Sequence, residues 1–384
     1  MKLRSVLFWL HLPCGVLAGA VILIMSVTGV LLTYQRQITA WADTRGYRIE
    51  HASQRLSADD LIVKVAESRP DLSPTALVVR SASSAPASFT VGAGRQLFVD
   101  PYTGAALGEG NGQNVRAFFR VVVEWHRYLA ASGASRPLGR AVTGASNLAF
   151  LFIVASGLVL WWPRSWTWAT VRNITWFRGG LRGKARDFNW HNTIGFWSAI
   201  PLAIIIAGGA VISYPWATAL VYRAYGEAAP APAVAAAVRG GGSRSAGPQI
   251  NGLPIETMVA AAVARMPDWK TISVALPAPD APRVVLTLDS GDGGQPHKRA
   301  TLTLDRRTGA AVRWEPFSSQ SSGRRARTWL RFAHTGEVYG LAGQTLAGLV
   351  TAGAIFLVWT GLALALRRFS RWRKRPSDAM LKAA

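Results

Sequence analysis

Four long stretches of this chain contain no Asp, Glu, Lys or Arg. They lie between Arg4 and Arg36, between Arg140 and Arg164, between Asp187 and Arg223, and between Glu337 and Arg367. A helix needs about 20 mostly apolar residues to cross a bilayer, and each stretch is long enough to supply one. The first stretch is long for a signal peptide and has no convincing small-residue cleavage site. The sequence therefore predicts an integral protein of the lipid bilayer with four transmembrane helices.

The charged segments outside these stretches predict how the chain is oriented. Segment 163–188 carries six basic residues and one acidic residue, and the tail after residue 366 is also strongly basic. Short basic segments of membrane proteins stay in the cytoplasm. We therefore expect a multi-pass protein of the bacterial inner (cytoplasmic) membrane with both termini in the cytoplasm. The two long segments, 34–138 and 215–335, would then face the periplasm.

The composition excludes several other classes of protein. The net charge is +23, from 43 Lys and Arg against 20 Asp and Glu, but the basic residues alternate with long uncharged stretches instead of filling one soluble domain. This distribution argues against a nucleic-acid partner. The single cysteine, Cys14, excludes internal disulfides and cysteine-based zinc or iron–sulfur sites.

The chain is an internal duplication. At an offset of 180, His11, Gly15, Gly29 and Tyr34 match His191, Gly195, Gly209 and Tyr214. Further along, Pro70-Asp71 matches Pro267-Asp268, the turn 100–107 matches 305–312, and His126 matches His334. At an offset of 204, Gly139, Gly144 and Gly157 match Gly343, Gly348 and Gly361. Because both halves begin in the cytoplasm, they are predicted to be parallel repeats related by an axis along the membrane normal.

The predicted fold class is an integral membrane α-helical bundle with an internal parallel duplication and two small periplasmic α+β modules. Each module has a helix-like run (59–67 and 256–265) and alternating strands such as 95–99 and 300–304, and segment 226–248 reads as a flexible linker. The expected segments are transmembrane helix 1 (5–34), module 1 (35–112), a periplasmic surface helix (113–131), transmembrane helix 2 (139–163), a basic cytoplasmic loop (164–187), transmembrane helix 3 (188–215), the linker and module 2 (216–322), a histidine-bearing outer segment (323–337), transmembrane helix 4 (338–366) and a basic cytoplasmic tail (367–384).

The surface helix and the second transmembrane helix are expected to be separate. A single straight helix from His126 to Trp161 would extend ~52 Å, which exceeds the ~30 Å apolar core of a bilayer. Ser132, Gly133 and Pro137 are therefore expected to break the chain. The apolar residues of the surface helix recur at helical spacing, and His126 lies on the same stripe.

Four of the six histidines occupy repeated positions near the ends of the predicted spans. His11 and His191 lie near the cytoplasmic starts of spans one and three, whereas His126 and His334 lie just before spans two and four on the other side. The repeat axis relates His11 to His191 and His126 to His334. The four histidines are therefore expected to form an inner pair and an outer pair. Imidazole pairs from facing helices of a membrane bundle hold b-type haem. We therefore predict two b-type haems, with His11 and His191 as axial iron ligands of the inner haem and His126 and His334 as those of the outer haem.

The residues around the four histidines, and the two remaining histidines, bear on this interpretation. A bare metal site is the alternative, but the predicted spans contain no Asp or Glu to complete a coordination shell. His51 and His297 have no repeat partners and are interpreted as surface residues. Six glycines in spans one and three would give a flat macrocycle room near the backbone: Gly15, Gly19, Gly29, Gly195, Gly208 and Gly209. Candidate partners for haem propionates are Arg127 and Arg331, together with Arg4, Arg120 and Arg186. Each of these arginines could equally be a positive-inside residue or one that snorkels to the membrane interface.

Several motifs resemble the PepSY-associated transmembrane-helix family. They are Leu7-Phe-Trp-Leu-His11, Trp161-Trp-Pro-Arg164, His334-Thr-Gly-Glu-Val-Tyr-Gly340 and the pair of modules with their Pro-Asp and Thr-Gly turns. Within that family the sequence is similar to inner-membrane ferric-siderophore reductases of the ferrioxamine type. The resemblance implies four spans, two periplasmic PepSY-like modules, two bound b-type haems and release of iron by reduction.

The expected activity is a haem-dependent ferric-siderophore reductase. It would pass electrons across the membrane to a ferric siderophore in the periplasm and release iron as Fe²⁺ during iron uptake, with no catalytic residues beyond the haem ligands. No nicotinamide or flavin fingerprint appears, so quinol or a separate cytoplasmic reductase would donate the electrons. Two alternatives remain open. One is a non-enzymatic membrane regulator whose modules bind a peptide or protease, and the other is a transporter for haem or iron.

Overall fold

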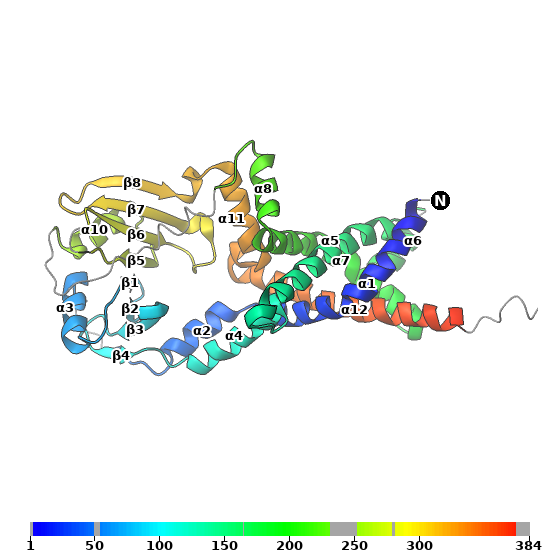
Figure 1. Ribbon diagram of the computed structural model, residues 1–384, viewed down its shortest axis with the longest axis horizontal. Coiled ribbons are helices and arrows are strands. Elements are labelled where there is room, and N and C mark those ends of the chain that lie inside the picture. The colour runs from blue at the N-terminus through cyan, green and yellow to red at the C-terminus, as the bar shows by residue number, and fades with distance from the viewer. Residues whose placement is uncertain (1–2, 50–53, 164, 231–251, 279–280, 374–384) are drawn as a thin grey trace, which may run out of the picture. The chain divides into compact units, whose positions relative to one another are not determined.

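The computed structural model describes residues 3–49, 54–163, 165–230, 252–278 and 281–373 (Figure 1). The chain folds into two compact units. A membrane unit contains the chain up to Tyr34, Phe118–Thr218 and the chain from Leu330 onward. A sheet unit contains Gln35–Ala117 and Ala219–Trp329. Of the linker expected at 226–248, residues 231–248 lie outside the described residues, as do His51 and the tail after Arg373.

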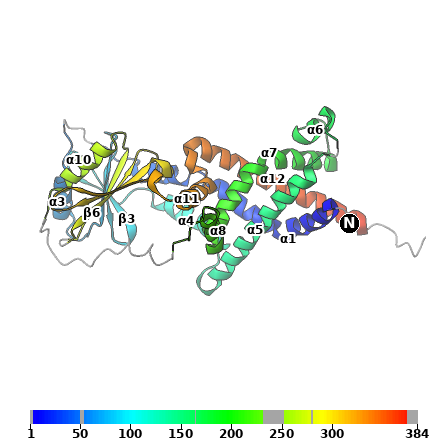
Figure 2. The ribbon, with the colours of Figure 1, turned by 90° about the horizontal axis from the view of Figure 1, so that it is seen from above.

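Among the described residues, four helices are long and apolar enough to cross a membrane, so the chain is a multi-pass membrane protein. They are α1 (Leu3–Leu32), α5 (Arg136–Trp161), α7 (Gly183–Ser213) and α12 (Gly340–Arg373). Helices α1 and α7 each pack against both α5 and α12 (Figure 2). The four helices therefore form a closed ring in which the repeat-related helices, α1 with α7 and α5 with α12, lie on opposite corners.

The cytoplasmic loop predicted at 164–187 contains more helix than expected. It includes α6 (Trp168–Thr175), and α7 begins at Gly183, before the predicted start of the third span. The side chain of Asn189 on α7 holds the end of α6 in place, because its amide nitrogen donates to the carbonyls of Asn173 and Trp176, both at 3.0 Å. Its oxygen accepts from the backbone N–H of Arg178 at 3.0 Å.

The amphipathic helix before the second span is α4 (Gln113–Tyr128), whose C-terminal part belongs to the membrane unit. The helical conformation ends at Leu129 and Ala130, which both have positive φ values (53° and 58°). This helix end comes before the one expected at Ser132 and Gly133. A 3₁₀ turn (η2, Gly133–Ser135) and α5 follow. Gly139 on α5 explains the tight return, because a Cβ there would lie only 2.1 Å from the carbonyl oxygen of Tyr128.

The corresponding segment of the second half is α11 (Ser322–His334), followed by a 3₁₀ turn (η5, Glu337–Tyr339) and α12. Here Gly336 turns the chain with φ 73°, and Gly343 takes the place of Gly139. A Cβ on Gly343 would lie 2.3 Å from the carbonyl oxygen of Gly336. The same contact therefore occurs in both halves. The carbonyl of the second residue after the histidine, Tyr128 or Gly336, packs on the following membrane helix, and it fits there because that helix has a glycine at the contact.

The sheet unit contains one antiparallel sheet of eight strands within the described residues, with the order β4-β3-β2-β1-β5-β6-β7-β8. The strands are β1 (Ala76–Arg80), β2 (Ala87–Val91), β3 (Arg95–Val99), β4 (Ala106–Gly108), β5 (Thr271–Ala275), β6 (Arg283–Asp289), β7 (Arg299–Asp305) and β8 (Ala311–Pro316). The two predicted modules thus share a sheet instead of folding as separate ones. They join because the first strand of each, β1 and β5, pair antiparallel, with Leu77 opposite Val274.

Two helices, α3 (Ala58–Ser68) and α10 (Ile255–Arg265), pack against one face of this sheet and close a single apolar core. The fully buried residues include Leu61 and Val65 of α3, Met258 of α10, and Leu77 and Ile272 of the paired strands. Each large apolar side chain buried in this way contributes ~1.5–3 kcal/mol of transfer free energy. Other described helices of the sheet unit are α2 (Gln35–Thr44), the start of α4, most of α8 (Pro215–Ala224), α11 up to Trp329, and the short 3₁₀ turns η1 (Gly92–Gly94), η3 (Pro296–Lys298) and η4 (Phe317–Ser319).

The two module helices cap each other. The carboxylate of Asp59, on α3, accepts from the backbone N–H groups of Ile255 and Glu256 at the start of α10, both at 2.9 Å. The carboxylate of Glu256 in turn accepts from the N–H of Ala58 at 2.7 Å. Helix N-termini leave such N–H groups unpaired and favour negative charge. The reciprocal caps therefore join the two repeats in addition to the strand pairing.

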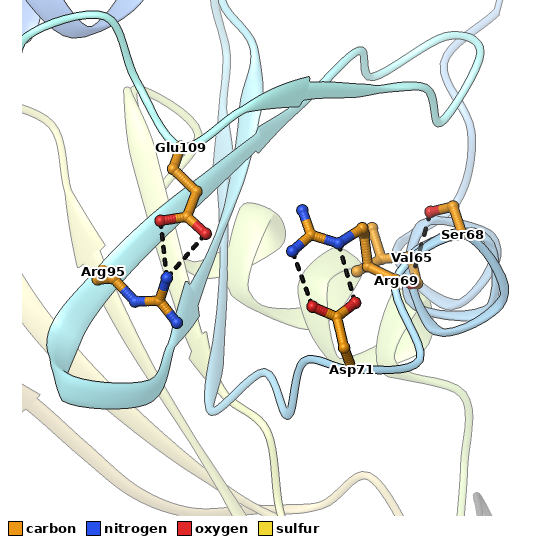
Figure 3. Close-up of polar contacts among 6 residues, drawn as sticks. All are labelled: Val65, Ser68, Arg69, Asp71, Arg95 and Glu109. Carbon is orange, nitrogen blue, oxygen red and sulfur yellow. Dashed lines mark hydrogen bonds and ion pairs between the residues drawn. The ribbon is translucent and has the colours of Figure 1, made fainter.

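The repeated turn at 100–107 and 305–312 has a structural role. Asp100 accepts from the backbone N–H groups of Tyr102 and Thr103, and Asp305 does the same for Arg307 and Thr308. The glycine that follows in each turn has a positive φ, as this tight geometry requires. Nearby, the first module carries two exposed ion pairs, Arg69 with Asp71 and Arg95 with Glu109 (Figure 3), which contribute little to stability in water.

Candidate functional site: two pairs of histidines

The four repeated histidines all belong to the membrane unit and are partly buried. His11 lies on α1 and His191 on α7, whereas His126 and His334 lie in the last turns of α4 and α11. Each imidazole packs on a glycine of a neighbouring membrane helix. The distance from the ring atom Cε1 to the position that a glycine Cβ would take is 3.5 Å for His11 at Gly157, 3.5 Å for His126 at Gly29, 3.4 Å for His191 at Gly361 and 3.3 Å for His334 at Gly209.

Each imidazole is also hydrogen-bonded through Nδ1 to the helix that carries its glycine. For three of them the partner is the hydroxyl of the residue just before the glycine: Ser156 for His11 (2.9 Å), Thr28 for His126 (2.9 Å) and Thr360 for His191 (3.0 Å). The fourth, His334, donates directly to the backbone carbonyl of Ile205 at 2.7 Å. The site therefore has one design, a glycine under the ring and an acceptor at Nδ1, which occurs four times.

The other ring nitrogen, Nε2, has no hydrogen bond to any residue that the structure describes. A carbonyl oxygen can only accept, so the Nδ1 of His334 carries the proton and its Nε2 presents a lone pair. An imidazole fixed through Nδ1–H with a free Nε2 is the usual form of a histidine that ligates a metal. An Nε2 lone pair of this kind is one that can serve as a metal ligand.

The outer pair is brought together across the ring of helices. The centroids of the His126 and His334 rings lie 6.3 Å apart, and their planes are inclined by 58°. His11 and His191 come from α1 and α7, the opposite corners of the ring. His297, by contrast, is exposed in the 3₁₀ turn η3 of the sheet unit.

The glycines at the site differ in part from those expected. Gly29 and Gly209 do contact histidine rings, but Gly157 and Gly361 do so as well, and the sequence interpretation had treated these two only as repeat matches. Gly15 has no such contact among the described residues, and Gly19 and Gly195 meet leucine side chains of α12 instead. The signal that identifies three of these glycines is the repeated Ser/Thr-Gly pair opposite His11, His126 and His191.

The candidate arginines have different surroundings. Arg127 lies over the ring of Tyr128 at 5.2 Å and Arg331 over that of Phe332 at 4.9 Å, and both are exposed. Arg186 and Arg4 already have protein partners. The guanidinium of Arg186 binds the carboxylate of Asp187 at 2.9 and 3.0 Å, and Arg4 donates to the carbonyl of Leu160.

Asp187 is a residue that the sequence interpretation overlooked. Because α7 starts at Gly183, this acid lies inside the helix, one turn before His191, and its side chain is fully buried. It pairs with Arg186 and, at 2.5 Å, with Arg367 of α12. The single acid in an otherwise basic segment was the available signal. Its role in the structure is to link α7 to α12 close to the inner histidines.

The described residues contain no cluster of three or more His, Cys, Asp or Glu that could enclose a metal ion. The repeated histidines instead form pairs. Two is the number of protein ligands that an iron held in a macrocycle takes when both of its axial positions are occupied.

The four membrane-spanning helices, their duplicated arrangement and the attached antiparallel sheet define the class, a multi-pass membrane protein with a paired α+β unit. The family model described as "PepSY-associated TM region" matches residues 8–368, nearly the whole chain. The protein therefore belongs to the PepSY-associated transmembrane family. A search of curated proteins found no match.

Proposed function

We propose that this protein is a di-haem oxidoreductase of the bacterial inner membrane, which passes electrons across the bilayer to a ferric siderophore in the periplasm. The observation that carries the proposal is the fourfold histidine design. Four imidazoles, each packed on a glycine and bonded through Nδ1, leave Nε2 free, and the repeat arranges them as two pairs.

The separation of the outer pair fits a shared iron. His126 and His334 would hold one iron through Nε2, which requires their rings to lie close to each other. The centroids of His126 and His334 lie 6.3 Å apart. The chemistry of the donors also agrees, because neutral imidazole is a common haem ligand.

His11 and His191 would hold the inner haem, and His126 and His334 the outer one. When bound, each haem supplies a one-electron Fe³⁺/Fe²⁺ couple. The glycines at positions 29, 157, 209 and 361 let the ligand rings approach the helices closely. Arg127 and Arg331, which lie close to the outer ligands along the chain, would pair with propionates at the outer site.

Two layers of histidine suit electron transfer across a membrane. The apolar core is ~30 Å thick, and one site in each leaflet divides that distance. The positive-inside rule places the basic segments, and with them His11 and His191, on the cytoplasmic side. The outer pair would then serve the periplasmic substrate, from which reduction to Fe²⁺ releases iron because Fe²⁺ binds hard oxygen ligands less tightly. Quinol or a cytoplasmic reductase is the proposed electron donor.

An absorption spectrum of the purified full-length protein tests the proposal. We expect a Soret band, sharp low-spin bands after addition of dithionite, and two haems per chain by pyridine haemochrome assay. The dithionite-reduced protein should then release Fe²⁺ from a ferric hydroxamate siderophore, detected with a ferrous-iron chelator. A protein purified from haem-replete cells without a Soret band would contradict the proposal.

A second candidate function has one observation in its favour. The face of the sheet opposite α3 and α10 has a groove of about 780 Å³ at the junction of the two modules, lined by Arg80, Lys270, Thr271, Ser273 and Thr287 among others. In a regulator, this groove would bind a peptide and the helices would only anchor it. Specific peptide binding by a protein without haem would favour this second function.

A further inference from the structure

We infer that the hydroxyls of Thr28, Ser156 and Thr360 are positioning groups that keep the histidine ligands in a single tautomer, with the proton on Nδ1 and the lone pair on Nε2. This inference rests on the proposed function, because it assigns a role toward the haem iron. It concerns three residues that the motif analysis did not single out. None of them would touch the iron, since each acts through its histidine.

The hydrogen atoms available at each hydroxyl decide which group donates to the imidazole. A hydroxyl has one hydrogen to donate, and each of these hydroxyls lies closest to the carbonyl four residues earlier in its own helix. The distances are 2.6 Å from Thr28 to Ile24, 2.7 Å from Ser156 to Phe152 and 2.7 Å from Thr360 to Phe356. Because a carbonyl only accepts, the hydroxyl hydrogen is used there. Toward the imidazole each hydroxyl oxygen must therefore accept, so Nδ1 is the donor and carries the proton.

The site of His334 differs from the other three because it has no hydroxyl before its glycine. The duplication places Gly208 where Thr28 stands in the first half. A Cβ at Gly208 would lie 2.4 Å from the carbonyl oxygen of Leu330 and 2.8 Å from Cβ of His334, so no hydroxyl-bearing residue fits. At this site His334 reaches the helix carbonyl of Ile205 itself. The other three imidazoles also interact with the equivalent carbonyl, of Ile153 for His11, Met25 for His126 and Leu357 for His191. A carbonyl only accepts, so a protonated Nδ1 is common to all four sites.

Serine and threonine in membrane helices often bond to the carbonyl one turn earlier without any further role. Thr351 of α12 provides a matched comparison. Its hydroxyl donates to the carbonyl of Ala347 at 2.7 Å, and its methyl group faces Gly29, but it forms no hydrogen bond to a histidine. A variant of Thr351 therefore measures what the loss of an ordinary membrane hydroxyl does at the same place in the bundle.

The experiment compares Thr28→Val, Thr28→Ser and Thr351→Val with the parent as full-length proteins in detergent. The readouts are haem content, the rate of haem transfer to apomyoglobin and the midpoint potential of each haem by optical redox titration. We expect Thr28→Val to hold the outer haem ~10–100-fold less tightly, the usual effect of losing a group that orients a metal ligand. Its outer midpoint potential should rise, because a less basic imidazole stabilises Fe³⁺ less. Thr28→Ser and Thr351→Val should match the parent.

Thr360→Val provides an independent test, because it should affect the inner haem and leave the outer one unchanged. Elution from a size-exclusion column shows whether each variant is folded. If the parent holds two haems and Thr28→Val and Thr360→Val retain both with unchanged potentials and transfer rates, this inference is wrong and the proposed function stands. If the parent binds no haem, the proposed function fails, and this inference fails with it.

Discussion

The rings of His126 and His334 lie 6.3 Å apart between centroids, although the two residues come from opposite halves of a duplicated chain. Each ring is held by a different helix. His126 is bonded to Thr28 of α1, and His334 to Ile205 of α7. Since α1 and α7 occupy opposite corners of the ring, the packing of the whole bundle sets the distance between the two imidazoles.

The first expectation concerns the number of haems. His126→Ala or His334→Ala should remove the outer haem, leave the inner one and abolish reduction of a ferric siderophore. His11→Ala or His191→Ala should remove the inner haem and leave the outer one reducible by dithionite. The measurement is haem per chain with ferrous-iron trapping. His297→Ala, in the sheet unit, is the control and should keep both haems. Two haems in every variant would contradict the proposed ligands.

Gly208→Ala should damage the outer site selectively. The added methyl would lie 2.4 Å from the carbonyl oxygen of Leu330, a main-chain atom that cannot move without shifting α11. Overpacking of this kind costs ~1–3 kcal/mol and here would displace His334. We expect a lower outer-haem content with a normal inner haem. Gly179→Ala, in the segment between α6 and α7, where a Cβ meets no described atom within 4 Å, should behave as the parent. Equal haem contents in the two variants would contradict this account.

Asp59→Ala should loosen the start of α10. Pro254, at the N-cap position of that helix, provides no side-chain cap, so the carboxylate of Asp59 takes this role from the other repeat. Removing a cap costs ~1–2 kcal/mol, which corresponds to ~5–30-fold faster amide exchange by local opening. Hydrogen-exchange mass spectrometry of the full chain measures it in the first turn of α10. Glu67→Ala, at an exposed position near the end of α3, is the matched control and should leave the exchange unchanged.

The turn after β7 should weaken in acid. Hydrogen bonds from the backbone N–H and hydroxyl of Thr308 hold the pKa of Asp305 below its ordinary value of 3.8. A carboxyl whose pKa is lowered by folding stabilises the fold above its unfolded-state pKa, and that contribution is lost as the pH falls through the folded-state pKa. Amide exchange at Thr308, corrected for the intrinsic rate, should therefore accelerate below about pH 4. Asp305→Ala should exchange fast at every pH. A parent whose protection is independent of pH would contradict this assignment.

The sequence alone was sufficient for the features that depend on local chemistry. Spans appear as uncharged stretches because a bilayer excludes charge over ~20 consecutive residues, wherever the segment packs. The duplication appears because matched residues recur in the same order in both halves, at an offset of 180 for His11 and His191 and of 204 for Gly157 and Gly361. The repeated turns that begin at Asp100 and Asp305 are likewise readable, since each carboxylate accepts from the backbone N–H groups two and three positions further along the chain.

Only the tertiary structure decided which residues complete each site. Pairing of Thr28 with His126, burial of Asp187 against Arg367, and the exchange of caps between Asp59 and Glu256 all join residues on different helices. The joining of the two modules into one sheet through β1 and β5 is a contact of the same kind. Spacing along a chain reports periodicity within one helix or strand, but not the rotation and depth at which two elements meet. Those are set by close packing over the whole fold, where a single methyl group at Gly208 would displace a neighbouring helix.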